Sequence, residues 1–163
     1  MQNWFETKIK YVRVDDDGRE RKVSEVYLVD SLSCTEAEAR LVKEMEQVIR
    51  GDSFITKVST SNVVEIFAHE TGEWWWKVKI GIVTIDEKAG KEKLIANYFL
   101  VNADDLKQAL QRTEEGLAYV LVPYHIDSIV RSNIMDVYPY FSADQLKAGI
   151  PNNLSPIEKI DEV

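Results

Sequence analysis

The strongest constraint on the fold of this chain is an internal repeat. The segment WFETKIKYV at 4–12 returns as WWKVKIGIV at 75–83, displaced by 71 residues. The segment ITKVSTSNVVEIF at 55–67 returns as IDSIVRSNIMDVY at 126–138 with the same displacement. Self-similarity of this length and spacing is the signature of repeated structural units. We therefore predict a tandem duplication of one folded unit.

Each unit is predicted to open with two strands joined by a hairpin. Residues alternate between apolar and polar in 4–12, and polar, glycine-containing turns follow at 15–18 and 86–90. The return strands at 26–29 and 98–101 are rich in aromatic and β-branched residues, which suit a half-buried sheet.

A capped helix and a closing strand are predicted to complete each unit. Thr35 with Glu38, and Asp105 with Gln108, have the spacing of capping boxes, and an apolar stripe of helical period follows each. The closing segments contain a Ser-Asn step at 61–62 and 132–133, which suggests either a bulge or a break into two short strands, the second of which would be a fourth strand of the unit. The prediction is an α+β fold in which strand-strand-helix-strand units form an antiparallel sheet with helices packed on one face.

The repeat also sets the expected domain organisation. We assign residues 1–73 to the first repeat, 74–141 to the second, and 142–163 to a C-terminal extension. The repeat pattern stops before the extension, which contains two prolines and two asparagines, so we expect it to be flexible. The pattern leaves open whether the two units share one sheet.

Composition indicates a small soluble protein. It excludes few classes of binding partner. The 163 residues carry a net charge of −8, which argues against a broad basic face for duplex DNA. The apolar runs are too short to span a membrane, and the first residues lack a signal-peptide pattern, so a cytoplasmic location is expected. A single cysteine, Cys34, excludes an internal disulfide.

The sequence shows none of the motifs that would indicate an enzyme. It has no glycine-rich phosphate loop, no serine elbow and no histidine pair at metal-ligand spacing. His69, His125 and Cys34 are interpreted as structural, and the acidic run 15–17 lacks the spacing of a calcium loop. We therefore expect a non-enzymatic protein with no catalytic residue, no metal and no cofactor.

The opening strands carry the pattern with most functional content. Alternation places tryptophan and lysine on one face of each strand: Trp4, Lys8 and Lys10 in the first unit, and Trp75, Lys77 and Lys79 in the second. Four hairpin cations are expected to extend this surface: Arg19, Arg21, Lys91 and Lys93. Such a surface can stack unpaired bases and meet phosphates with ammonium groups. It is equally what an ordinary solvent-facing strand with lysine-protected edges presents.

Two functions therefore remain open. The leading hypothesis is single-stranded nucleic-acid binding through the duplicated Trp/Lys face. The alternative is a protein-protein interaction module, in which the chain binds another protein or itself as a homodimer through exposed aromatics such as 74–76. Salt dependence distinguishes the two, because phosphate contacts release counterions.

Several segments carry a family resemblance. They are Trp4-Phe5, YLVD at 27–30, TEAEA at 35–39 and IMDVYPY at 134–140. With them the chain resembles an uncharacterised domain-of-unknown-function family (family 4494) of bacteria and their phages, over roughly residues 3–141. The resemblance implies a phage or mobile-element context and brings no activity or site residue with it.

The repeat predicts that core residues occur in matched pairs: Ile9 with Ile80, Leu28 with Leu100, Val58 with Ile129, and Ile66 with Val137. Alanine at Ile9 or Leu100 should lower the free energy of unfolding by about 2 to 5 kcal/mol, because it removes buried methylene groups and leaves a cavity. Urea unfolding measures this loss. A change below about 0.5 kcal/mol, typical of surface sites, would mean that the core face is misassigned.

Overall fold

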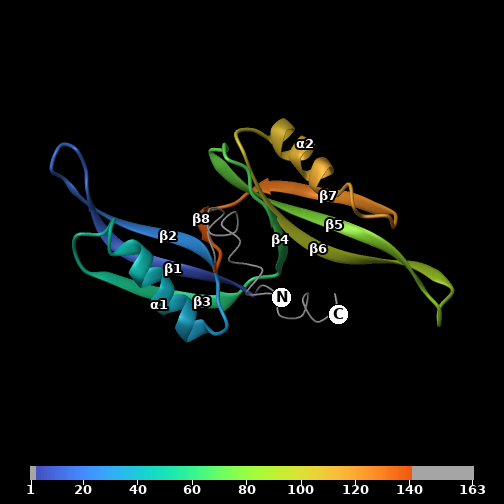
Figure 1. Cartoon of the computed structure of the whole chain (residues 1–163), viewed down its shortest axis with the longest axis horizontal. Helices are drawn as coiled ribbons and strands as arrows, with labels where there is room; N and C mark the ends of the chain where they lie inside the picture. The colour runs from blue at the N-terminus through green and yellow to red at the C-terminus, as the bar shows by residue number, and fades with distance from the viewer. Residues whose placement is uncertain (1–2, 141–163) are drawn as a thin grey trace, which may run out of the picture.

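The computed structural model describes residues 3–140, which form two similar halves that extend away from a shared centre (Figure 1). The elements follow one another as β1 (Trp4–Val14), β2 (Glu20–Asp30), α1 (Cys34–Met45), β3 (Ser53–Thr60), β4 (Val63–Phe67), β5 (Trp74–Asp86), β6 (Lys91–Ala103), α2 (Leu106–Gly116), β7 (Tyr124–Arg131) and β8 (Ile134–Tyr138). The order strand, strand, helix, strand, strand thus occurs twice. The described chain is mostly β with two helices, an α+β fold.

The strands form two four-stranded sheets. Sheet 1 has the order β3-β1-β2-β8 and sheet 2 the order β4-β6-β5-β7. Three strands of each sheet come from one half of the chain, and the fourth comes from the other half. The pairs β2–β8 and β4–β6 are parallel, whereas the other neighbours are antiparallel. The expectation of an antiparallel sheet was therefore wrong, because an exchanged strand arrives from the opposite half of the molecule.

The exchange begins at the Ser-Asn steps. Ser61 N donates to Trp4 O at 2.7 Å, and Ser132 N donates to Trp75 O at 2.8 Å, so each serine ends its ladder at the start of the first strand. The serine hydroxyls then accept from the backbone two residues later, at Val63 N and Ile134 N. The predicted break and fourth strand are confirmed. The Ser-Asn step indicates that such a strand exists, but not the sheet it joins.

Local signals account for the hairpins and helix starts. Gly18 and Gly90 have φ of 82° and 63° in the two hairpin turns, a conformation that L side chains rarely adopt. Helix α2 has the predicted capping box, with Asp105 Oδ1 accepting from Gln108 N at 2.8 Å and Gln108 Oε1 accepting from Asp104 N at 2.8 Å.

Helix α1 begins differently from the prediction. Ser33, not Thr35, is the N-cap, and its hydroxyl accepts from Glu36 N at 3.1 Å. Glu36 accepts in turn from Leu32 N at 3.0 Å. The same capping-box chemistry thus lies two residues earlier, where another Ser-x-x-Glu spacing occurs.

Each helix packs on one face of its own sheet. The core beneath α1 contains Ile9, Val29 and Leu41, and the core beneath α2 contains Ile80, Val101 and Leu117. A third cluster joins the two sheets through the faces that carry no helix, which we call the outer faces. Its buried members are Trp4, Leu28, Val63, Leu100 and Ile134, and the half-buried Trp75 packs against them.

The predicted core pairs lie in these clusters. Ile9, Ile80, Leu28 and Leu100 are fully buried, whereas the remaining four are partly buried and pack against the same cores: Val58, Ile129, Ile66 and Val137. Leu28 and Leu100 also belong to one cluster, because both lie between the two sheets.

One arginine of each helix holds the strand that arrives from the other half. Arg40 of α1 donates to Asp30 O and, at 2.9 Å, to Pro139 O, which follows β8. Arg112 of α2 donates to Asn102 O at 2.6 Å and to Thr71 O, which follows β4. A guanidinium can bridge two carbonyls because its donors are arranged as a rigid fork.

The predicted division at 73/74 lies between β4 and β5, and the exchanged strands mean that hydrogen bonding crosses it in both directions. The predicted extension 142–163 lies outside the described residues. Within 3–140 no helix has the length and apolarity needed to cross a membrane.

The arginine contacts generate a prediction for Arg112→Ala. It should lower the free energy of unfolding by about 2 to 3 kcal/mol, because hydrogen bonds from a charged donor are lost. Amide exchange in β4 should accelerate, since its end is released. Arg19→Ala is the control, because Arg19 contacts only the exposed Asp17 among its described ionic partners. Equal effects of the two variants would contradict the proposed role of Arg112.

Candidate interaction surfaces

The strand register places the predicted tryptophans and lysines on the outer faces. In β1 the helix-facing residues are Phe5, Thr7, Ile9 and Tyr11, so Trp4, Lys8 and Lys10 lie on the opposite face. In β5 the helix-facing set includes Trp76, Val78 and Ile80, so Trp75, Lys77 and Lys79 lie opposite. The alternation was predicted correctly in both strands.

The tryptophans do not form the expected stacking surface. Trp4 is only 3% exposed, and Trp75 is half-buried against the same cluster between the sheets. The expectation of two exposed rings is wrong for Trp4. Large aromatic rings bury much apolar area, and here they close the contact between the outer faces.

The four lysines do not share one surface. Lys8 and Lys10 are exposed, whereas Lys77 and Lys79 are half-buried, and Lys77 Nζ lies 5.1 Å from the centroid of the Tyr98 ring. The outer faces pack against each other at the centre. The parts of the two faces outside this contact extend in opposite directions. The two hairpins lie at opposite ends of the long axis (Figure 1).

The hairpin cations do not extend the outer faces either. In the strand register, Arg21 lies opposite Arg13, Lys91 lies opposite Asp86, and Lys93 lies opposite Thr84. By alternation, all these positions belong to the helix-facing side of their sheets. Arg19 and Arg21 also form ion pairs with Asp17 at 3.4 Å and Asp15 at 3.3 Å. Their charge is therefore partly compensated within the hairpin.

Sheet 1 nevertheless places two further lysines, Lys22 and Lys57, which the sequence pattern did not indicate, on the same face as Lys8 and Lys10. Lys57 of β3 lies opposite Lys8, and Lys22 of β2 lies opposite Val12. We call Lys8, Lys10, Lys22 and Lys57 the lysine face. Phe54, opposite Lys10, is 67% exposed beside it. A shallow hollow on this side is lined by Glu6, Lys8, Val26, Lys57, Ser59 and Asn133.

The corresponding part of sheet 2 is apolar. Its outer face presents Val83 and Ile85 on β5, and Leu94 and Ala96 on β6, which we call the apolar face. Ile85 is 69% exposed and Leu94 is 55% exposed. By register, Leu94 takes the position that Lys22 has in sheet 1, and Ala96 takes that of Ser24. Sequence alternation in 91–96 is weak, so only the register assigns these residues to one face.

The 74–76 run is less available than expected. Trp76 is half-buried and donates from Nε1 to Ala103 O at 3.0 Å. Trp74 is 40% exposed, and the Arg131 guanidinium lies 4.5 Å from its ring centroid. Of the three tryptophans, Trp74 offers the most surface to a partner.

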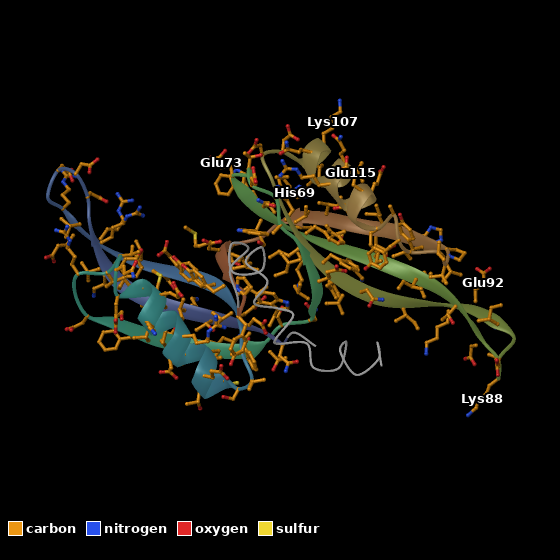
Figure 2. All side chains as sticks on the ribbon, viewed as in Figure 1. His69, Glu73, Lys88, Glu92, Lys107 and Glu115 are labelled. Carbon is orange, nitrogen blue, oxygen red and sulfur yellow. The ribbon has the colours of Figure 1, made fainter. Side chains whose placement is uncertain are left out.

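A groove between the halves contains several titratable groups. It is lined by residues of α1, β5, β8 and the β4–β5 connection, among them Glu44, His69, Trp75, Asp136 and Tyr138. Figure 2 shows His69 near the middle of the molecule, on the β4–β5 connection. Burial raises the pKa of Asp136, and burial together with the nearby Arg112 lowers the pKa of His69. Within 3–140 no three histidine, cysteine or carboxylate side chains lie close enough to hold a metal ion.

The other residues interpreted as structural lie apart from this groove. Cys34 is the exposed first residue of α1. His125 is an exposed residue of β7 that lies opposite Gly81 of β5. Neither brings a second reactive group to His69.

Comparison with known proteins gives one finding. No curated protein and no solved structure matches the chain. The family described as "Domain of unknown function (DUF4494)" matches residues 3–140, which is the whole of the described fold. Because this match covers far more than half of the sequence, the chain belongs to the DUF4494 family.

Proposed function

We propose that the protein is a non-catalytic protein-interaction module and that it docks its partner on the apolar face of sheet 2. The observation that carries this proposal is the exposure of Ile85 and Leu94 on one sheet face, next to Val83 and Ala96. Apolar side chains grouped on an exposed face are typical of interaction sites, whereas single exposed ones are not.

The fold does not require an apolar residue at the position of Leu94, although the exposed Val12 and Val14 of sheet 1 match Val83 and Ile85. Sheet 1 has the same strands in the same register, and its residue at the position of Leu94 is the exposed Lys22. Lysine is therefore compatible with this place in the unit. The apolar side chains of sheet 2 add little to its core, and their exposed apolar surface is available to a partner.

We also infer that the two halves arose by tandem duplication. The same order of elements, the constant displacement of 71 residues and the reciprocal exchange of β4 and β8 support this. Reciprocal exchange is what a strand-swapped homodimer would retain after fusion of its two chains. The outer faces would then have diverged, one towards lysine and the other towards apolar residues.

In-cell cross-linking tests the proposed docking face. A photo-reactive residue at Ala96 should give a discrete adduct with a protein that mass spectrometry identifies, and Leu94→Lys in the same chain should abolish it. The same probe at Ser24, the matched position in sheet 1, is the control and should give no such adduct. Equal adducts from both positions, or an adduct that survives Leu94→Lys, would contradict the proposal.

A second candidate function is single-stranded nucleic-acid binding on the lysine face. It differs from the sequence-based site, since Phe54 replaces the buried Trp4 as the ring available for stacking. The four lysines of sheet 1 supply the cations, and Lys77 and Lys79 of sheet 2 are not needed. Ammonium groups beside an exposed aromatic ring are the chemistry that unpaired strands recognise.

Fluorescence anisotropy with an oligothymidylate of about 20 nucleotides tests this second candidate. Lys8→Glu with Lys57→Glu should weaken binding and flatten its salt dependence, because fewer counterions are released. Phe54→Ala should cost about 1 to 3 kcal/mol of binding free energy. Lys77→Glu with Lys79→Glu is the control and should change little. Absence of salt-dependent binding by the unsubstituted chain, or equal losses from both pairs, would rule this function out.

A further inference from the structure

We infer that the groove between the halves binds an alkylammonium group, which is attracted by the carboxylates of Glu44 and Asp136 and packs against the rings of Trp75 and Tyr138. The ammonium group belongs either to a free amine or to the lysine side chain of a peptide, because both present the same chemistry. This site is separate from the apolar face and does not depend on the proposed function. Three features carry the inference: the walls of the groove, the balance of its charges and its difference from the matched place in the other half.

Aromatic and apolar side chains form much of the wall of the groove. The groove lies at the centre of the molecule, where β8 meets β5 (Figure 1). Trp75, Tyr138 and Pro139 line it and are half-buried, and its volume is about 510 Å³, within the usual range of ligand sites. The Tyr27 ring stacks on Tyr138 with 5.6 Å between centroids and so supports that ring. Aromatic rings attract cations and also pack against alkyl chains, so these walls suit both parts of an alkylammonium group.

The two carboxylates that line the groove favour a positively charged ligand. Neither Glu44 nor Asp136 forms an ion pair with any residue of 3–140. Burial raises the pKa of Asp136, although Val137 N donates to its Oδ1 at 2.8 Å. Burial, together with the negative charges of Asp136, Glu44 and Glu25, raises the pKa of Tyr138 to about 12. A bound cation would stabilise these carboxylates, because an opposite charge favours the ionised form.

The permanent cation of the groove is already engaged elsewhere. Arg40 donates to Asp30 O and Pro139 O, and its guanidinium lies 4.6 Å from the centroid of the Tyr140 ring. Its hydrogen-bond donors are thus directed to main-chain carbonyls and not to the two carboxylates. Arg40 therefore leaves those carboxylates available to a ligand.

The other basic side chain that lines the groove, His69, adds little charge. Burial lowers the pKa of its imidazole, and so does the nearby Arg112, whereas Glu115 raises it. The usual pKa of histidine is about 6.5, so a lowered pKa leaves the ring mostly neutral at pH 7. Two carboxylates, one committed guanidinium and a neutral imidazole give the groove a net negative charge.

The matched place in the other half is closed by packing. The buried positions of the two helices correspond one to one: Ala37, Leu41 and Met45 in the first half, and Ala109, Thr113 and Leu117 in the second. Gly116 therefore corresponds to Glu44, and a Cβ added at Gly116 would lie only 2.8 Å from the Phe67 ring. Phe67 corresponds to Tyr138, so α2 lies directly on this ring, whereas Glu44 of α1 and Tyr138 both line an open groove.

The remaining matched positions differ in the same direction. Glu65 corresponds to Asp136 and accepts a hydrogen bond from the Tyr119 hydroxyl at 2.7 Å. Trp4 corresponds to Trp75 and is only 3% exposed. One half thus uses these positions for internal contacts, and the other presents them to the groove. The fold does not require the open arrangement, which supports a role for it in binding.

An NMR titration of the full chain tests the inference. The probes are putrescine and an acetylated, amidated glycyl-lysyl-glycine peptide, with n-butanol as the neutral control. The ammonium probes should give saturable shifts at the Trp75 indole and the Val137 amide, with a Kd on the order of millimolar for such small ligands. The butanol should give no saturable shift there. Tighter binding of the peptide would identify a lysine side chain as the source of the ammonium group, and tighter binding of putrescine a free amine.

Two charge-removing variants test the carboxylates. Asp136→Asn and Glu44→Gln should each raise the Kd of the ammonium probes at least about fivefold, since each removes one ionic contact and keeps the side-chain shape. Glu65→Gln, at the matched position of the other half, is the control and should leave the Kd unchanged. Circular dichroism confirms that each variant is folded. Absence of a saturable shift with both ammonium probes, equal shifts with n-butanol, or an unchanged Kd in Asp136→Asn would overturn the inference.

Discussion

The packing of the two outer faces is the contact on which the rest of this structure depends. Trp4, Leu28, Leu100 and Ile134 are buried only because each half covers the other. The exchange of β4 and β8 brings these residues together, since each exchanged strand supplies one edge of the foreign sheet. Neither half would have a complete sheet alone, so we expect the two halves to fold as one cooperative unit.

The same contact decides which surfaces remain for function. It removes Trp4 from solvent, and the uncovered parts of the two outer faces extend in opposite directions. A ligand that binds the lysine face of sheet 1 therefore cannot continue onto Lys77 and Lys79 of sheet 2. What remains are two unlike surfaces, the lysine face of sheet 1 and the apolar face of sheet 2. Duplication would provide the two equivalent frames, and substitution at matched positions such as Lys22 and Leu94 makes them different.

The helix arginines show how a repeated residue can serve an exchanged architecture. Arg40 and Arg112 each bond a carbonyl of their own sheet and a carbonyl that follows the incoming strand. The partners differ, because Arg40 also lies 4.6 Å from the Tyr140 ring centroid, whereas Arg112 also donates to the Thr71 hydroxyl. The two contacts are therefore similar in geometry and distinct in chemistry.

Local chemistry determined much of this protein. The alternation in 4–12 and 75–83, the turn glycines and the Asp105 cap act over a few residues, and the sequence alone predicts them. Tertiary structure decided which sheet β4 and β8 join, that Trp4 is buried, and that Lys57 stands beside Lys8. Alternation specifies a side of a strand but neither its neighbour nor what covers it. Those depend on contacts between residues far apart in the sequence, such as Val63 with Tyr98, Lys8 with Lys57 and Val26 with Ile134, which local periodicity does not encode.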